Sequence, residues 1–585
     1  MNEQTVVKIT AENGANLMPF SHLVINQQFN GHHFFELRLN NEVIEDANSL
    51  IVDKAKDFLG KVITVSFRSD DGKYPENIFK GIIAEVGIAN SSGDGGDIVF
   101  KGYSPTVLLE TGKHLASYND VTLADIVNKT LSGVASNLLS STVNPVFKKV
   151  IPYLVQYNES NFEFVRRLAE NYGEFLVYDG VTLYFGKPPA GTAFNLEYPV
   201  EITDLNFSMK VMPLNFELVE YDSESGKKFI STKPQINGLD SFGNFAKSSS
   251  NNLFNGKVKT LSHVKSTDNG DLNSIAQFKA SAKASALAQI TASSDFCFLK
   301  PASNINIGAI LQHNGKKQDF GKYMVINITH SIDGLGNYSN TFDAIAASVD
   351  VAPNSSDKKP LAEPQLGVVS DNHDPDNLGR VKVQLLWQDA PTPWIRVVSL
   401  HSGGTNRGIF FLPEVGDYVM VGFSQNDPDR PFVMGSVPHG KNIDSSKNDD
   451  NSIKSIRTRT GSTLYFKDKD KSKEQEIIIK TDDQNIISIT VENGKGTIKI
   501  ASSKDIQISS DSSISIKSGN ISIEASNKLE LKAKDINIEA QNKLSEKGMD
   551  VAIEGSLSTK VKASATLEVD GGAMTTIKGG LVKIN

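Results

Sequence analysis

Paired aliphatic residues return every seven or eight positions along the C-terminal part of the chain. Each pair reads apolar–polar–apolar, as in Ile514-Ser515-Ile516, and runs of Ser, Asp, Asn, Lys and Gly separate the pairs. Alternation at period two places both aliphatic side chains on one face of an extended strand, and the residues between pairs turn the chain readily. The pairs that we expect to face inward are Ile498 and Ile500, Ile506 and Ile508, Ile514 and Ile516, Ile521 and Ile523, Leu529 and Leu531, and Ile536 and Ile538.

A repeat this short cannot bury its own apolar residues, so it must stack on copies of itself. Stacked strands lie about 4.8 Å apart and a single-chain solenoid uses about three strands a turn, so one chain would form a stub of about 20 Å. Three intertwined chains would share every level and build a shaft of roughly 50 Å. Residues 497–585 therefore predict a homotrimeric β-helix, with a single-chain solenoid or an ordinary sandwich as alternatives.

The 119 residues after Phe466 contain no aromatic residue and no proline. Proline is excluded where every strand must donate ladder hydrogen bonds. A different class of protein, a polysaccharide-degrading β-helix enzyme, needs grouped carboxylates and aromatic rings that stack on sugars. The lack of rings argues against that alternative.

The first 350 residues are predicted to be mainly β, with alternating stretches such as 82–88 and a short apolar run at 98–103. One helix is expected after Ser160, because Ser160 and Glu163 have the spacing of a capping box and Gly173 ends the apolar stripe. A second, alanine-rich helix is expected at about residues 273–292.

Polar linkers at residues 351–364 and 441–455 divide the chain. Between them, residues 365–440 contain short strands and both tryptophans, Trp387 and Trp394, which predicts a small barrel. Residues 456–496 would then connect this barrel to the predicted β-helix of residues 497–585.

The block between the linkers carries the most specific motifs, Gly379-Arg380-Val381-Lys382-Val383, Phe411-Leu412-Pro413-Glu414-Val415-Gly416-Asp417 and Asp427-Pro428-Asp429-Arg430-Pro431. It resembles the oligonucleotide/oligosaccharide-binding-like (OB-like) barrel of VgrG proteins, the spike proteins of type VI secretion, and of related contractile-phage tail spikes. The run 157–180 is similar to the tail-hub portion of that family, and 460–468 is similar to the segment before its needle.

The resemblance implies a mainly β, multidomain fold: tail-hub-like β-barrel domains with a few helices over residues 1–350, the OB-like barrel, and an intertwined trimeric β-helix, or β-prism needle. It implies a non-enzymatic puncturing spike of a contractile injection apparatus, mounted on the Hcp tube and baseplate, that delivers effectors with or without adaptor proteins. A PAAR-repeat protein would cap the needle at Gly579, Gly580, Val582 and Ile584, where a blunt β-stack leaves open strand edges. A phage tail or an extracellular injection particle is the alternative vehicle.

Two features depart from the family pattern. The repeat is mostly isoleucine with serine and lysine instead of valine and glycine, which keeps the packing logic and loosens the turn geometry. The linker between barrel and needle is far too short for the lysozyme domain of phage relatives, so no catalytic residue is expected.

The net charge and the lack of targeting signals limit which partners and which cellular location are expected. The net charge of −8 lacks the strong basic excess of a nucleic-acid binder, so no nucleic-acid partner is expected. The N-terminus has no basic segment followed by an apolar core, and no apolar run reaches membrane-spanning length. A chain with neither a signal peptide nor stable membrane insertion would be assembled in the cytoplasm and then secreted by the apparatus. The single Cys297 is predicted to be a buried thiol.

Several short motifs suggest chemistry but are better explained as structure. His373-Asp374-Pro375-Asp376 is predicted to be a turn, and Asp427-Pro428-Asp429-Arg430 a corner in which the arginine pairs with an aspartate. Residues 92–97 are expected to form a flexible loop and 493–497 a hairpin turn. Of His32 and His33, one is expected in a core and one at the surface. No metal or other cofactor is predicted.

Overall fold

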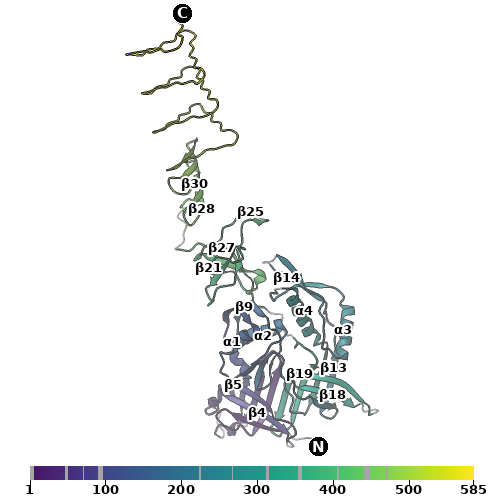
Figure 1. The fold of residues 1–585 in the computed structure, drawn as a ribbon. Coiled ribbons are helices and arrows are strands. Elements are labelled where there is room, and N and C mark those ends of the chain that lie inside the picture. Colours follow the sequence, from purple (N-terminus) through teal and green to yellow (C-terminus); the bar gives the residue numbers. More distant parts are fainter. Residues whose placement is uncertain are drawn as a thin grey trace. The chain divides into compact units, whose positions relative to one another are not determined.

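The computed structural model in Figure 1 divides into two compact units, residues 1–445 and 446–585. The structure describes residues 5–46, 51–69, 72–89, 96–222, 226–266, 268–310, 315–353, 359–404, 407–440, 448–469 and 472–584. Among these residues, no helix is both long and apolar enough to cross a membrane.

The largest sheet of the first unit has twelve strands and curls into two barrel-like halves (Figure 1). The first half has the order β1-β4-β5-β6-β3-β2, and β2 pairs with β19 of the second half. The strands of the first half are β1 Thr5–Ala11, β2 Phe20–Gln28, β3 Phe34–Asn40, β4 Val62–Ser69, β5 Asn77–Ala89 and β6 Asp97–Tyr103. Those of the second half are β12 Phe194–Tyr198, β13 Ile202–Met209, β17 Ala288–Ser294, β18 Asn304–Ile310, β19 Lys317–Asp333 and β20 Tyr338–Ala346.

Period-two alternation fills the cores of both halves. In β3, for example, Phe35, Leu37 and Leu39 are fully buried and alternate with half-buried residues. The β-strands predicted around residues 82–88 and 98–103 are confirmed as parts of β5 and β6.

Helices and small sheets are inserted between strands of the large sheet in the sequence, some between β6 and β12 and others between β13 and β17. The helices are α1 Leu123–Leu131, α2 Asn161–Tyr172, α3 Ser241–Leu253 and α4 Asn269–Ala284. The short strands are β7 His114–Thr122 with β9 Val150–Glu159, then β8 Ser140–Val143, β10 Leu176–Tyr178 and β11 Thr182–Phe185, and finally β14 Phe216–Asp222, β15 Lys227–Ile230 and β16 Val258–Leu261.

One helix prediction is confirmed and the other is partly wrong. Helix α2 begins with the expected capping box between Ser160 and Glu163 and ends at Gly173, whose φ of 71° is the left-handed conformation that glycine favours. The alanine-rich helix α4 ends at Ala284, whereas residues 288–294 form strand β17. Strand β17 pairs with β13 on one side and β20 on the other, so sheet pairing and burial of alternate residues outweigh the helix propensity of alanine.

A small five-stranded barrel completes the first unit and confirms the predicted OB-like architecture. Its strand order is β23-β22-β21-β26-β27. Its core consists of buried valines with a few larger residues, and Trp387 Nε1 donates a hydrogen bond of 2.7 Å to Gln365 Oε1 at its side. The strands are β21 Gln365–Asp371, β22 Arg380–Leu385, β23 Ile395–Arg396, β26 Tyr418–Phe423 and β27 Pro431–Ser436, with a separate hairpin of β24 Ser402–Gly403 and β25 Arg407–Gly408.

The second unit begins with a five-stranded antiparallel meander. Its strands follow one another in space as in sequence: β28 Ile453–Arg457, β29 Thr463–Lys469, β30 Glu474–Lys480, β31 Ile486–Glu492 and β32 Lys495–Ala501. Asn493 and Gly494, with φ of 50° and 77°, join β31 to β32, so the predicted hairpin turn at residues 493–497 is confirmed.

A chain of buried polar side chains crosses the first unit. Gln27 Nε2 donates to His33 Nδ1 at 3.3 Å, and Gln27 Oε1 lies 3.1 Å from His330 Nε2. His330 Nδ1 lies 2.6 Å from the hydroxyl of Tyr338. Each imidazole therefore carries its proton on Nε2, and both are neutral. Burial lowers the pKa of His33 and of His330 to about 3. His32 is partly exposed and bonds Glu110, so the expected core and surface histidines are both found.

We predict that replacing His330 with Gln costs less stability in acid than at neutral pH. The folded pKa of His330 lies below the unfolded value, so only the unfolded chain takes up this proton as the pH falls from about 6.5 towards 3. The histidine's contribution is thus complete above pH 6.5 and is lost below it. The destabilisation caused by His330→Gln should shrink by roughly 2–3 kcal/mol between pH 7.5 and 4.5 in denaturant titrations. His373→Gln, at an exposed histidine, should show no such change.

Candidate functional site: the aliphatic face of the C-terminal unit

An aliphatic stripe, two residues wide, runs across one face of the meander. Direct cross-strand partners carry it from Phe466 to Ile477, then to Ile489 and Ile498. A parallel line connects Leu464, Ile479, Ile487 and Ile500. Apart from the half-buried Leu464, all of these side chains are exposed. Strands β29 to β32 thus each present two apolar side chains on a common face, separated by one residue of the other face.

Residues 503–584 continue the same unit without strand pairing in their own chain. Bends recur at residues 503, 511, 519, 526, 534, 541, 549 and 556, so extended runs alternate with turns at intervals of seven or eight residues. Every residue from 503 to 584 is exposed, including the aliphatic pairs. In the pair Ile514 and Ile516, the exposed fractions are 54% and 72%. The periodic bends that the sequence predicts are therefore present.

Main-chain groups in this segment also lack partners within the chain. Over residues 503–584 one backbone–backbone hydrogen bond is formed, from Met574 N to Gly571 O at 3.2 Å. An extended main chain has strong hydrogen-bond donors and acceptors. Burying an aliphatic side chain that lies in water would be favourable by about 1.5–3 kcal/mol. Both kinds of group are therefore accessible to a partner.

The pair Ile498 and Ile500 lies on this face, and a core role for the six predicted pairs stays a prediction. The stripe starts earlier than the sequence analysis placed it. Ile477 and Ile479, and Ile487 and Ile489, belong to it. The signal was available in Ile487-Ser488-Ile489, which has the same apolar–polar–apolar form as the later units.

Two protein-family models match parts of the first unit. Residues 35–334 match the phage tail baseplate hub (GPD) family. Residues 365–437 match the type VI secretion system/phage-baseplate injector OB domain.

The chain belongs to the phage tail baseplate hub family. Sequence relatives confirm the resemblance to VgrG: the type VI secretion system spike protein VgrG5 of Pseudomonas aeruginosa is 42% identical over 73 residues, 12% of this chain. That match covers 9% of the relative's length, so the shared region is a small part of that protein.

Solved structures share the hub-family fold. A chain of the half-lidded Francisella PdpA–VgrG complex aligns with a TM-score of 0.55 and 10% identity, over 86% of this chain and 88% of that one. The E. coli c3393 protein, described as a type VI secretion component similar to T4 tail proteins gp27 and gp5, aligns with a TM-score of 0.50 and 14% identity, over 74% of this chain and all of that one.

Within this hub fold, the Asp427–Arg430 motif joins the OB barrel to the hub. Arg430 Nε lies 3.2 Å from Asp427 Oδ2, which confirms the predicted corner. The same guanidinium forms a two-pronged ion pair with the buried carboxylate of Glu220 on strand β14, with Nη2–Oε2 at 2.7 Å. Asp429 Oδ1 accepts a hydrogen bond of 2.7 Å from Val155 N on strand β9.

A second buried ion pair lies beside Asp429. Arg167 of α2 holds Glu159 of β9 through Nε–Oε1 and Nη2–Oε2 contacts of 2.8 Å each. Burial and, after it, the negative charge of Asp427 raise the pKa of Asp429 to about 7, although the charge of Arg167 lowers it. The joint therefore contains more carboxylates than guanidiniums, and a proton on Asp429 reduces the excess negative charge.

The remaining motifs are structural as predicted. Asp374 caps the turn at residues 373–376 by accepting hydrogen bonds from Asp376 N and Leu378 N and by pairing with Arg380. The Arg380 guanidinium holds the pKa of the Asp374 carboxyl well below its usual range. Cys297 is buried. Most of the predicted loop at residues 92–97 lies outside the described residues.

We predict that Asp429→Asn becomes increasingly favourable relative to the native residue as the pH rises. The folded pKa of Asp429 lies above its unfolded value of 3.8, so its contribution is complete below pH 3.8 and is lost as the pH rises through about 7. Asparagine keeps the acceptor for Val155 N without the charge. The stability of the variant relative to native should increase by about 1–2 kcal/mol between pH 5 and 8 in thermal or urea unfolding.

Asp427→Asn is the matched control, because it removes an ion-pair partner of Arg430. It should destabilise the protein at both pH values. An Asp429→Asn variant with the same relative stability at pH 5 and 8 would show that this carboxyl does not hold the extra proton.

Proposed function

We propose that three copies of this chain form the spike of a type VI secretion apparatus, in which the aliphatic faces of the C-terminal units interlock as a needle. The single observation that carries the proposal is the exposed aliphatic register of residues 503–584, which no other described residue of the chain covers. Membership in the baseplate hub family supports the setting. The proposed parts are a hub at residues 1–350, an OB-like collar at 365–440 and a needle at 497–585.

The proposed role is mechanical and involves no catalysis. In a trimer, each level would bury aliphatic pairs from three chains. Burial of each side chain that is still exposed in the single chain would stabilise the trimer by about 1–2 kcal/mol. Interchain ladders would satisfy the main-chain groups that lack partners in one chain. Such a shaft resists unwinding because every level must separate before a chain can leave.

Partners at the two ends follow from the same architecture. The hub would seat on the Hcp tube and baseplate, and the spike would be assembled in the cytoplasm and secreted on contraction. Effector or adaptor binding is supported by the solved complex of a VgrG with PdpA, which shares this fold. A PAAR-repeat protein would cap Gly579, Gly580, Val582 and Ile584, the last of which is 89% exposed. A phage tail or extracellular particle is the second candidate vehicle, because the hub and OB matches also include phage baseplate proteins.

Replacing both Ile514 and Ile516 with Asp should abolish needle assembly. Six carboxylates at one level of a trimer would be buried without partners, at a cost of several kcal/mol each. Light scattering should give the mass of a monomer, or the mass of a trimer whose needle is frayed and sensitive to protease. Ser515→Asp is the matched control on the opposite face of the same strand and should assemble normally. If the double variant retains a protease-resistant needle, the aliphatic pairs do not form its core.

Replacing Val582 and Ile584 with Asp should prevent capping while leaving the trimer intact. The two residues share a face of the final extended run, and Lys583 between them faces away. Capture of a purified PAAR-repeat protein should be lost in the double variant and retained in Lys583→Glu. Equal capture by both variants would exclude this tip as the binding surface.

A further inference from the structure

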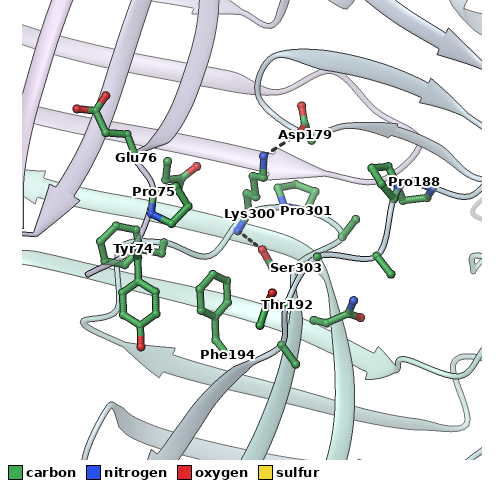
Figure 2. A pocket seen from close by; sticks show the side chains of 18 of the residues that line it. Tyr74, Pro75, Glu76, Asp179, Pro188, Thr192, Phe194, Lys300, Pro301 and Ser303 are labelled. Atoms are coloured by element: carbon green, nitrogen blue, oxygen red, sulfur yellow. Dashed lines mark hydrogen bonds and ion pairs between the residues drawn. The ribbon is translucent and has the colours of Figure 1, made fainter. Parts of the chain in front are cut away.

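A cavity of about 800 Å³ lies in the hub between the two barrel halves (Figure 2). The β4–β5 connection supplies Tyr74 on one side, and the β17–β18 connection supplies Phe298 and Lys300. The segment between β11 and β12, residues 186–193, forms another wall. Ligand pockets typically have volumes of about 300–1,000 Å³, so this cavity is large enough for several residues of a peptide.

Aromatic rings form the apolar wall of the cavity. Figure 2 shows the rings of Tyr74 and Phe194 beside each other, and their centroids are 5.5 Å apart at an interplanar angle of 78°. Phe298 lies 5.1 Å from Tyr74. Tyr74 and Phe194 are only half-buried, so their remaining ring surface faces the space that a ligand would fill. Edge-to-face contact with a further ring is favourable at such a wall.

The polar side of the cavity is fixed by Lys300. Its Nζ lies 2.8 Å from Asp179 Oδ2, and the other oxygen of Asp179 accepts hydrogen bonds from Val181 N and Thr182 N (Figure 2). The turn between β10 and β11 therefore fixes the carboxylate of Asp179, and this carboxylate fixes the ammonium group of Lys300. An ammonium has three donors, so Lys300 retains donors for a carbonyl or carboxylate oxygen.

The main chain of the wall at residues 188–193 has no hydrogen bonds to other described residues. None of its backbone N–H or C=O groups bonds another described residue, and the segment runs directly into strand β12. A second cavity of about 400 Å³ lies on its other side, also lined by Pro188, Pro189 and Ala190. An extended segment with unpaired donors and acceptors is a template for an added strand.

We propose that this cavity docks an extended segment of a partner protein, which pairs its main chain with residues 190–193 and places one aromatic or proline ring against Tyr74 and Phe194. The open backbone calls for a ligand that has alternating N–H and C=O groups of its own, which an extended peptide has and a compact small molecule lacks. The rings select the anchor side chain, and Lys300 donates a hydrogen bond to a carbonyl or carboxylate oxygen beside it. The site is separate from the aliphatic face and does not depend on the needle.

Saturation-transfer NMR on the full chain tests this site, because the method detects weak ligands of large proteins. The probe is an acetylated and amidated octapeptide of Gly and Ser with a central Phe-Pro, compared with the same peptide carrying Ala-Ala. The ring protons of the first peptide should show the strongest saturation. Thr192→Trp, which fills the cavity from an exposed position, and Tyr74→Leu, which removes a ring but keeps bulk, should each weaken its Kd by about fivefold.

Phe245→Leu, at a phenylalanine that is 66% exposed on α3, is the matched control and should bind as the native chain does. Methylating the peptide nitrogens that flank the anchor should also weaken binding, because it removes main-chain donors. Absent saturation of the ring protons, or unchanged binding in Thr192→Trp and Tyr74→Leu, would overturn the proposal. Equal binding of the methylated peptide would overturn main-chain pairing. Binding by monomeric but not by self-associated protein would assign the cavity to contact between copies.

Discussion

Over residues 503–584 the aliphatic side chains are exposed and the main chain forms no strand pairing with other described residues, and the proposed organisation of the second unit depends on this constraint. A folded segment usually buries its apolar residues locally, yet here all of them are exposed over more than 80 residues. Their regular register shows that the exposure is ordered: the same face recurs at every unit, and the meander β28–β32 begins the stripe with direct cross-strand pairs. A surface this regular fits identical copies of itself better than an unrelated partner.

The joint between the hub and the OB barrel needs a different kind of stability, because the proposed spike would have to pass load from its base to its shaft. Arg430 reaches from the OB barrel to Glu220 of the hub, and Asp429 reaches to Val155. Breaking one partner of a buried ion pair typically costs 3–5 kcal/mol, so these contacts hold the barrel firmly on the hub. The cost of burying so many carboxylates is reduced by the proton on Asp429 and by the pairing of Glu159 with Arg167.

Sequence alone predicted the features whose signals are local. The aliphatic pairs such as Ile514 and Ile516 are visible as a period, and helix α2 is visible from its cap at Ser160 and its stop at Gly173. The OB-like barrel was identified from motifs that lie within one short block. The trimeric arrangement remains a proposal, since a single chain does not contain its partners.

Features that depend on distant residues were missed. Strand β17 was assigned to a helix because its alanines favour one, whereas pairing with β13 and β20 decides its conformation. The partner of Arg430 lies 210 residues away, so no spacing pointed to Glu220. The cavity at Tyr74, Phe194 and Lys300 is assembled from connections between strands of both barrel halves, and none of those segments has a recognisable motif.

The mass of the purified full chain in solution tests the central claim most directly. Light scattering at micromolar concentration should give about 191 kDa, three times the chain mass of 63.6 kDa. A mass of 63.6 kDa for well-folded protein would contradict an intertwined needle, because the aliphatic faces would then remain in water.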